Sequence, residues 1–412
     1  MAISFEQLID PVTPAEFFKD YYEKKPLLIE TRDRTRFDPL LSVAAIDRFL
    51  ATTSPSYPDV FLVDAARELK PEDYSFQSGE PAGRLDLPRV YENFASGATI
   101  SISHLQECLP ELAALCRAAE KVFSGHCQTN IYLSPPNAQG FKTHFDSHDV
   151  FVLQVSGSKH WSINDTLVEL PLRGQAFQPD THVPGPVSRE LTLRPGDLFY
   201  CPRGLFHAAR STDEVSLHIT LGLIGKTWAD VMAEAVSEAC LASPAFRANL
   251  PAGFADAGFD RAAARETFRS LVESFAGSTR LDPILDRMVD DFVKSRRPDQ
   301  SGRLTGIHDA AEIAAASRVV ARPHIIYLLR EENEQLTIVF GSTQITMPPF
   351  TKEPVAFALA GTPFAVGDLP GELDEAGKIV LVRRLIGEGL LMRAEDLPAL
   401  SEAKTGRPAL VA

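Results

Sequence analysis

Three side chains in this sequence are of the types that hold a catalytic metal ion. His144 and Asp146 are separated by one residue in the segment GFKTHFDSHDVFVLQ, and His207 follows in LRPGDLFYCPRGLFHAA. Residues two apart in a β-strand point to the same face, so this imidazole and this carboxylate can converge on one ion. Two histidines and one carboxylate form the facial triad that leaves positions open on non-haem Fe(II). The pattern therefore predicts an iron site suited to oxygen chemistry.

Two other histidines lie close to this set. His148 shares a strand face with Asp146 but then lacks a further partner, and we interpret it as a residue behind the ligands or at the rim of the site. His218, in SLHITLGL, lies on the strand after His207 and is expected to be a hydrogen-bonded pocket histidine rather than a fourth ligand. An H-x-D pattern also arises by chance in solvated strands. The residues by themselves leave a metal site and a solvated pair as alternatives.

The candidate ligands lie in a β-rich part of the chain. Between residues 127 and 223, short runs of β-type residues are broken by Pro, Gly, Asn and Asp. The runs are TNIYL, HDVFVLQV, KHWSIN, RELTL, DLFYC and EVSLHITLGL. Closely spaced strands without intervening helices are typical of an antiparallel sandwich or barrel. We expect this barrel to be the scaffold that positions the three side chains.

The segments on either side of the barrel are mostly helical. Residues 5–50 contain two amphipathic helix candidates that flank a short extended run, PLLIE, and apolar residues recur at helical spacing from Leu105 to Ala119. After Gly225 come three amphipathic patterns, TWADVMAEAVSEACLA, DRAAARETFRSLVESFA and DPILDRMVDDFVKSRR, none with a candidate metal-ligand cluster. Packing or self-association is the default role of such helices, so we predict a helical dimerisation module over 226–310.

The last hundred residues return to strands. HIIYLLR, QLTIVFG and TQITM are strand candidates, and a helix is expected near 373–386 before Gly387-Glu-Gly-Leu-Leu391. A small sheet with a helix and a hairpin is typical of a winged-helix module. Residues 319–412 hold nine Lys/Arg against twelve Asp/Glu. This net negative charge argues against direct binding to DNA.

Composition limits the classes of partner. The chain has 412 residues, which is long enough for more than one domain, and its formal net charge is −14. Such a charge disfavours nucleic acid and anionic membrane and favours a basic partner such as a Lys/Arg-rich protein. Five scattered cysteines indicate neither a disulfide framework nor a zinc site, and we expect reduced, buried thiols. With no secretory signal and no long apolar run, a cytoplasmic location is expected.

The motif segments resemble those of the JmjC/cupin-like ribosomal oxygenases. The resemblance is carried by NIYLSPPNAQGFKTHFDSHDVFVLQVSGSKHW at 130–161 and LRPGDLFYCPRGLFH at 193–207, and FFKDYYEKKPLLIE at 17–30 is similar to the family's N-terminal opening. It implies an α+β chain with a double-stranded β-helix, the cupin/JmjC jelly roll. The implied domains are a catalytic domain with an N-terminal elaboration over 1–225, a helical dimerisation region over 226–310 and a winged-helix-like domain over 311–412.

The resemblance also implies roles for individual residues. The matching iron ligands are His144, Asp146 and His207. Lys159 matches the basic residue, Lys or Arg in the family, that holds the distal carboxylate of 2-oxoglutarate. Asn130 and Tyr132 share one strand face and match positions that line the cosubstrate pocket. The implied cofactor is Fe(II), with 2-oxoglutarate and O2 as cosubstrates.

The implied activity is that of a dioxygenase that hydroxylates a side chain, arginine or histidine, of a ribosomal or other basic protein. The sequence leaves other JmjC substrates open, namely a non-ribosomal peptide, a tRNA base or a small molecule. Two further alternatives stay open. One is a cupin-like binding protein without turnover, and the other is a winged-helix regulator with a ligand-sensing barrel. A homodimer formed through the central helices is expected.

Overall fold

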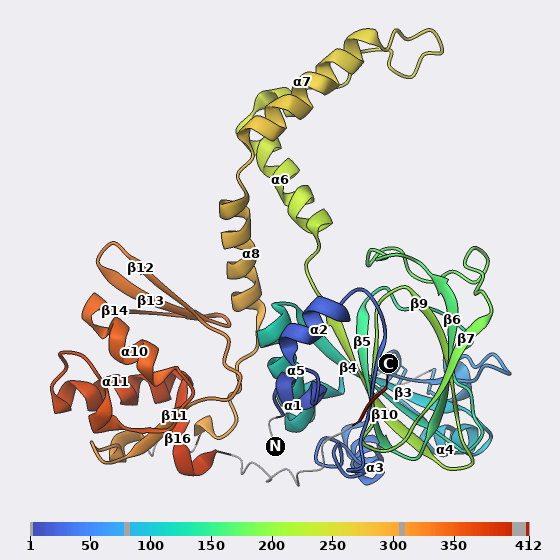
Figure 1. Ribbon diagram of the computed structural model, residues 1–412, viewed down its shortest axis with the longest axis horizontal. Helices are drawn as coiled ribbons and strands as arrows, with labels where there is room; N and C mark the ends of the chain where they lie inside the picture. The colour runs from blue at the N-terminus through green and yellow to red at the C-terminus, as the bar shows by residue number, and fades with distance from the viewer. Residues whose placement is uncertain (1–2, 78–82, 305–309, 398–408, 412) are drawn as a thin grey trace.

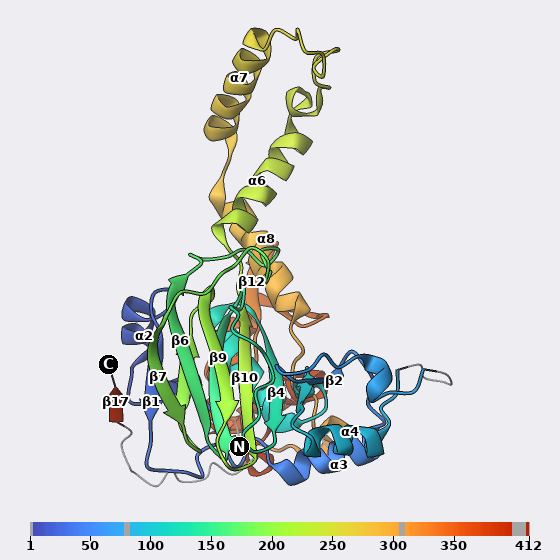
Figure 2. The ribbon, with the colours of Figure 1, turned by 90° about the vertical axis from the view of Figure 1, so that its right-hand side faces the viewer.

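The β-type runs between residues 127 and 223 form two facing antiparallel sheets (Figures 1 and 2). The computed structural model describes residues 3–77, 83–304, 310–397 and 409–411. The larger sheet has the strand order β17-β1-β8-β5-β10-β4-β3-β2, and the smaller has the order β7-β6-β9. The barrel strands of the larger sheet are β4 (His126–Ser134), β5 (Asp149–Ser156), β8 (Leu198–Cys201) and β10 (Ser216–Ile224). Those of the smaller sheet are β6 (Lys159–Leu167), β7 (Val187–Leu193) and β9 (Leu205–Ser211).

The two sheets enclose an apolar core. Side chains from β5 and β8 of the larger sheet pack against side chains from β6, β7 and β9 of the smaller one. Alternation along each strand places residues such as Trp161 and Ile163 inward. The jelly-roll prediction is confirmed, together with the six strands expected from the sequence. Four described strands of these two sheets were missed: β2 (Val60–Val63), β3 (Thr99–Ser103), β17 (Ala409–Val411) and β9, which carries His207.

The N-terminal segment covers the outer face of the larger sheet (Figure 1). Its elements are α1 (Phe5–Ile9), α2 (Pro14–Asp20), β1 (Leu27–Glu30), α3 (Val43–Thr53), α4 (Leu87–Ala95) and α5 (Pro110–Phe123). Rings from α1, α2 and α5 pack on Phe151 and Tyr200 of the sheet, with Phe17 and Tyr200 only 4.9 Å apart between centroids. These rings support the larger sheet from its outer face.

Two helix predictions in this segment need correction. The first candidate splits into α1 and α2, because Thr13 caps a new helix by accepting a hydrogen bond from the backbone of Glu16 and Pro14 occupies its first turn. The helix expected from Leu105 begins instead at Pro110, and Leu105–Glu107 forms a separate 3₁₀ turn. Proline at a first helical position sets the start because its missing N–H costs nothing there.

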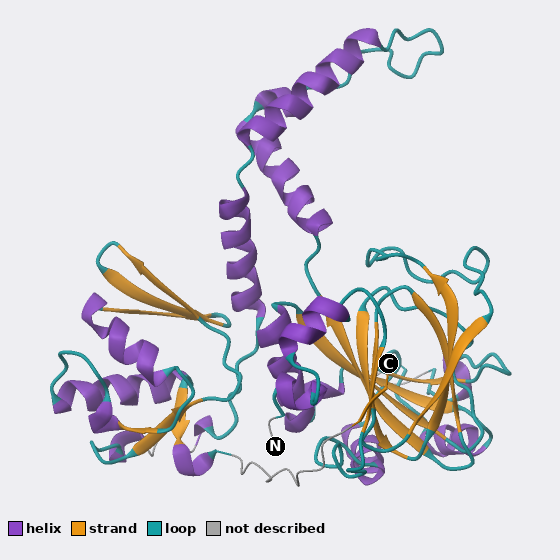
Figure 3. Ribbon diagram, in the orientation of Figure 1, coloured by secondary structure: helices purple, strands orange, loops and turns teal. Residues whose placement is uncertain are grey.

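Three helices project away from the barrel as an arm (Figures 1 and 3). They are α6 (Trp228–Ala242), α7 (Ala262–Ser278) and α8 (Leu281–Ser295), which confirms the three predicted helical segments. Few of their described side chains are buried, and Trp228 is 72% exposed. The base of the arm is held by Arg296, whose guanidinium donates to the buried carboxylate of Glu120 on α5.

The C-terminal part has a small core of its own and lies on the other side of α8 from the barrel (Figure 1). Its elements are β11 (Arg318–Ala321), β12 (Leu328–Glu332), β13 (Gln335–Phe340), β14 (Thr343–Met347), α10 (Lys352–Ala358), β15 (Phe364–Ala365), α11 (Glu375–Glu388) and β16 (Leu391–Arg393). The chain then returns to the barrel, where β17 (Ala409–Val411) pairs with β1. None of the helices in the described ranges combines the length and apolar content needed to cross a membrane.

The cysteines are unpaired, as expected, but they are not all buried. Cys116, Cys127 and Cys201 are buried, whereas Cys108 is exposed and Cys240 is half-buried.

Candidate metal centre

His144 and His207 are brought together by the backbone. The N–H of His144 donates to the carbonyl of His207 at 3.1 Å, and the reverse bond measures 2.8 Å. Two residues on, the carbonyl of Asp146 accepts from the N–H of Gly204 at 2.8 Å. His144 and Asp146 therefore lie in an irregular segment before β5 and not on a strand, so the argument from strand alternation was wrong. The ladder to β9 and its preceding turn brings the three side chains together instead.

The three ligand-type side chains converge. One ligand atom from each of His144, Asp146 and His207 lies within 4.8 Å of the other two, and Nε2 of His207 is 3.7 Å from Oδ2 of Asp146. Nδ1 of His144 lies 2.8 Å from the carbonyl of Lys142, and Nδ1 of His207 lies 3.0 Å from that of Leu205. A proton on each Nδ1 completes these bonds and leaves both Nε2 lone pairs for a metal, the arrangement that orients histidine ligands in proteins.

The electrostatics favour the ligand form of His207. Burial, followed by the neighbouring imidazole of His144, lowers the pKa of His207, and the carboxylate of Asp146 only partly opposes this. A histidine with a lowered pKa is neutral at physiological pH, and the neutral imidazole is the form that binds metals.

A cavity of about 70 Å³ joins this cluster to Lys159. Lys159 begins β6 and is only 4% exposed, and its ammonium donates to Oγ of Ser134 at 3.1 Å and lies 3.4 Å from Nδ1 of His218. No carboxylate within the described ranges forms an ion pair with it. Burial lowers the pKa of Lys159 to about 7. A buried cation without an anion favours a negatively charged ligand, because pairing would offset the cost of burial.

The other predicted residues are placed differently around this cavity. Tyr132 lines it and stacks on His218, with ring centroids 4.9 Å apart. Asn130, on the same strand, is half-buried but is not among the described residues that line the cavity. His218 is buried in the cavity wall, and both burial and Lys159 hold its pKa well below the ordinary value. It is therefore a neutral hydrogen-bonding histidine, as the sequence indicated.

His148 does not join the metal cluster in the described structure. Its Nε2 is buried without a hydrogen-bond partner and lies against the backbone of Gly222. It contributes instead to a separate groove of about 1280 Å³ between the barrel and the base of the arm.

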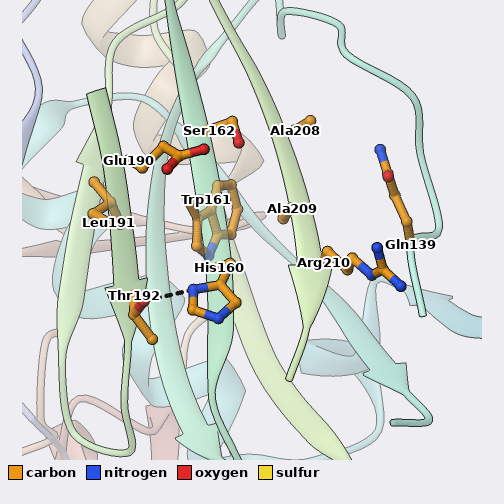
Figure 4. A pocket seen from close by; sticks show the side chains of 10 residues that line it. All are labelled: Gln139, His160, Trp161, Ser162, Glu190, Leu191, Thr192, Ala208, Ala209 and Arg210. Carbon is orange, nitrogen blue, oxygen red and sulfur yellow. Dashed lines mark hydrogen bonds between the residues drawn. The ribbon is translucent and has the colours of Figure 1, made fainter. Parts of the chain in front are cut away.

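A further hollow, of about 590 Å³, lies on the outer face of the smaller sheet (Figure 4). There His160 bonds Thr192 across the strands, with Nδ1 and Oγ1 2.6 Å apart. Because neighbouring strand residues face opposite ways, His160 points away from the cavity that Lys159 enters. Trp161 and Ala209 line both hollows and form the wall between them.

Several residues in and beside the cavity escaped the analysis of the sequence. Trp161 lines the cavity 5.7 Å from the ring of His207, and Thr99 lines it from β3. Ser134, beside the cavity, accepts a hydrogen bond from Lys159. Trp161 was detectable, since it lies two residues after Lys159 on the same strand face. Thr99 was not, because the strand that carries it was missed.

Several known proteins are similar to this chain. Residues 101–231 match the model of the JmjC domain. The chain is 36% identical over 216 residues to the bifunctional lysine-specific demethylase and histidyl-hydroxylase NO66 of Drosophila persimilis, covering 52% of this chain and 31% of that protein. It is 27% identical over 444 residues to ribosomal oxygenase 1 of Danio rerio, covering 96% and 80% of the two chains. Residues 101–231 therefore match a JmjC domain, and the chain is similar to ribosomal oxygenases.

The fold is also found in a solved bacterial protein. The X-ray structure of ycfD from E. coli superposes with a TM-score of 0.55 at 14% identity, covering 92% of this chain and 97% of the other. Another structure of the same E. coli protein, described as a ribosomal oxygenase in complex with cobalt and 2-oxoglutarate, gives a TM-score of 0.52. At this identity the likeness shows the fold alone. The chain spans only about a third of the length of its NO66 relatives from Drosophila persimilis and Aedes aegypti.

Proposed function

We propose that this protein is an Fe(II)- and 2-oxoglutarate-dependent dioxygenase that hydroxylates an arginine or histidine side chain of a ribosomal or other basic protein. One observation carries the proposal. A two-histidine, one-carboxylate cluster and a buried ammonium without an anionic partner line the same cavity, within the described part of the chain.

The side chains present fit the groups that this activity requires. His144, Asp146 and His207 would hold Fe(II), since two imidazoles and a carboxylate suit that ion and leave open positions. Lys159 would bind the distal carboxylate of 2-oxoglutarate as a point charge, with Ser134 orienting its ammonium. When bound, Fe(II), 2-oxoglutarate and O2 together supply the oxidation of a substrate C–H bond.

The protein itself contributes orientation and exclusion of water. The carbonyls of Lys142 and Leu205 fix the two imidazole rings, so that both Nε2 atoms stay directed at the metal position. Trp161, only 5% exposed, closes the cavity toward the smaller sheet, and the half-buried ring of Tyr132, stacked on buried His218, closes another side. A dry site strengthens the pairing between Lys159 and a carboxylate.

The substrate class is supported by charge and by relatives. A formal net charge of −14 favours a basic partner. The relatives named above are a bifunctional lysine-specific demethylase and histidyl-hydroxylase and a ribosomal oxygenase. Mass spectrometry of ribosomal proteins from wild-type and deletion cells should reveal a +16 Da change that requires this gene. Unmodified ribosomal proteins in both strains would contradict the ribosomal substrate and redirect the search to other peptides, tRNA or small molecules.

The cofactor assignment is tested without a substrate. Anaerobic addition of Fe(II) and 2-oxoglutarate to the purified protein should produce a weak visible charge-transfer band, and His144→Ala should abolish it. Absence of the band in folded wild-type protein would refute the oxygenase proposal. Succinate formation without any hydroxylated partner would favour a binding protein over a hydroxylase.

We also propose that the arm is a dimerisation region over 226–310 and that 311–412 is a winged-helix-like domain that does not bind DNA. The arm exposes apolar side chains at Trp228, Met232, Val236, Leu241, Phe268 and Val272. Burying such a face against a second copy would remove it from water. Light scattering should give twice the chain mass, and Trp228→Ser with Met232→Ser should shift it toward the monomer.

Absence of DNA affinity at low salt would support the proposal that the domain over 311–412 does not bind DNA. Cytoplasmic location also stays a prediction.

A further inference from the structure

The metal ligand Asp146 has no strand of its own to hold it. Its backbone is irregular, and its carbonyl is held by the N–H of Gly204 at 2.8 Å, in the turn 202–204 between β8 and β9. The same turn binds the start of the β6–β7 connection, since the N–H of Val168 donates to the carbonyl of Gly204 at 3.0 Å. A contact that holds this turn in place therefore also holds the backbone of Asp146 in place.

The turn has little freedom of its own. Gly204 has a φ of +84°, and a Cβ added there would lie 1.8 Å from the carbonyl oxygen of Val168. A bulkier residue cannot be accommodated without moving the chain. The backbone of the turn therefore sets the direction in which the side chain of Arg203 points.

Arg203 closes a ring of polar contacts behind the site. Its Nη1 lies 2.7 Å from Oε1 of Glu23 and 3.4 Å from Oδ2 of Asp149. Oδ1 of Asp149 accepts from the hydroxyl of Tyr200 at 2.6 Å, and that hydroxyl accepts from the backbone N–H of Glu23 at 2.9 Å. The ring thus joins the N-terminal segment, β5, β8 and the turn.

The charges make this ring depend on the guanidinium. Asp149 is 1% exposed, and burial raises its pKa, while Tyr200 and Arg203 act in the opposite direction. Two carboxylates share one cation here. Without Arg203 the buried carboxylate of Asp149 would lose its counter-charge beside a second acid, and the turn would have to move to admit water.

We propose that Arg203 is a positioning residue for the metal ligand Asp146. It acts through the turn 202–204 and does not contact the metal position itself. This inference rests on the proposed function, because it assumes that the cluster binds a metal. Groups that support metal ligands from behind affect metal affinity by about 10–100-fold when they are removed.

The test compares two arginines that each pair with a buried aspartate. Arg203→Met should weaken Co(II) binding, followed by calorimetry, by about 10–100-fold and shift the visible bands of bound Co(II). Arg203→Lys keeps the charge and should recover part of the affinity. The matched control is Arg34→Met, because Arg34 pairs with fully buried Asp197 at 2.9 Å in the turn before β8, away from the ligands.

The outcomes separate this inference from the proposed function. Arg34→Met should retain wild-type Co(II) affinity even if its thermal stability falls. If Arg203→Met melts cooperatively and binds Co(II) as tightly and with the same spectrum as the wild type, the inference is wrong while the metal site stands. If Arg34→Met weakens binding equally, the effect is general destabilisation, which also overturns it. Failure of the wild-type protein to bind Co(II) refutes both proposals.

Discussion

Lys159→Met removes the buried cation of the metal-site cavity while keeping an unbranched side chain of similar length. In the native protein this ammonium is 4% exposed and contacts only Ser134 and His218 among the hydrogen bonds of the described residues. The distal carboxylate of 2-oxoglutarate would lose its counter-charge at the buried end of the cavity. Breaking a buried pair by removing one partner costs about 3–5 kcal/mol, which corresponds to roughly a hundredfold to a few thousandfold loss of affinity.

The same substitution should make the ligand-free protein more stable against unfolding. The pKa of Lys159 is about 7 in the folded state, against 10.5 for the free side chain. Because the folded value is the lower one, the penalty on folding is full below pH 7 and disappears as pH rises to 10.5. At about 1.4 kcal/mol per pKa unit, it is about 4–5 kcal/mol at pH 7. Methionine carries no such penalty, so we expect Lys159→Met to unfold at a higher urea concentration.

Both effects are measurable on one preparation. Calorimetric titration of Co(II)-loaded protein with 2-oxoglutarate reports affinity, and urea unfolding of metal-free protein reports stability. Lys142→Met serves as control, since Lys142 is an exposed lysine two residues from His144 and only its backbone carbonyl contacts that side chain. Wild-type affinity for 2-oxoglutarate in Lys159→Met would refute the assignment of this lysine. A simultaneous loss of stability and affinity would show that it holds the fold instead.

Three further predictions follow from individual contacts. Affinity for 2-oxoglutarate should fall by roughly 25-fold between pH 6.5 and 8.5, because Lys159 loses its proton near pH 7, and Lys159→Met should lack this dependence in the same titrations. Gly204→Ala should lower the urea midpoint, whereas Gly174→Ala, with nothing within 4 Å, should leave it unchanged. Glu120→Gln should cost about 3 kcal/mol locally by removing the counter-charge of Arg296; hydrogen exchange should then quicken at the end of α8 but not in α6.

The barrel was predictable because its strands follow strong local patterns. Runs such as HDVFVLQV and EVSLHITLGL hold enough β-branched and aromatic residues to fix the strand without tertiary help. β9 was missed because LFHAARS contains two alanines and an arginine, and its pairing with β6 comes from the sheet rather than from propensity. The strand β3, TISIS, lies between two helical segments and carries two serines and a threonine, and it was missed for a related reason.

The structure brings together the three side chains that the sequence indicated, but through a different part of the backbone from the one expected. Strand alternation appeared to align His144 with Asp146, yet both precede β5, and the contact that aligns them is made with β9 and the turn before it. Local spacing indicated which side chains could bind a metal. It carried no information on the backbone that holds them, because that backbone is defined by partners about sixty residues away.

The support behind the ligands lies still further from sequence analysis. Glu23 and Tyr200 are separated by 177 residues, and neither has a motif that marks it as part of a metal site. In the sequence only the turn signal of Pro202 and Gly204 was visible. It predicts that the chain reverses direction there, but not that the turn holds Asp146. A buried acid such as Asp149 is costly unless it is paired, so its place directly after the ligand segment is itself informative. The chain accepts that cost where Asp146 must be held, which is why we expect metal affinity, more than stability, to respond to Arg203.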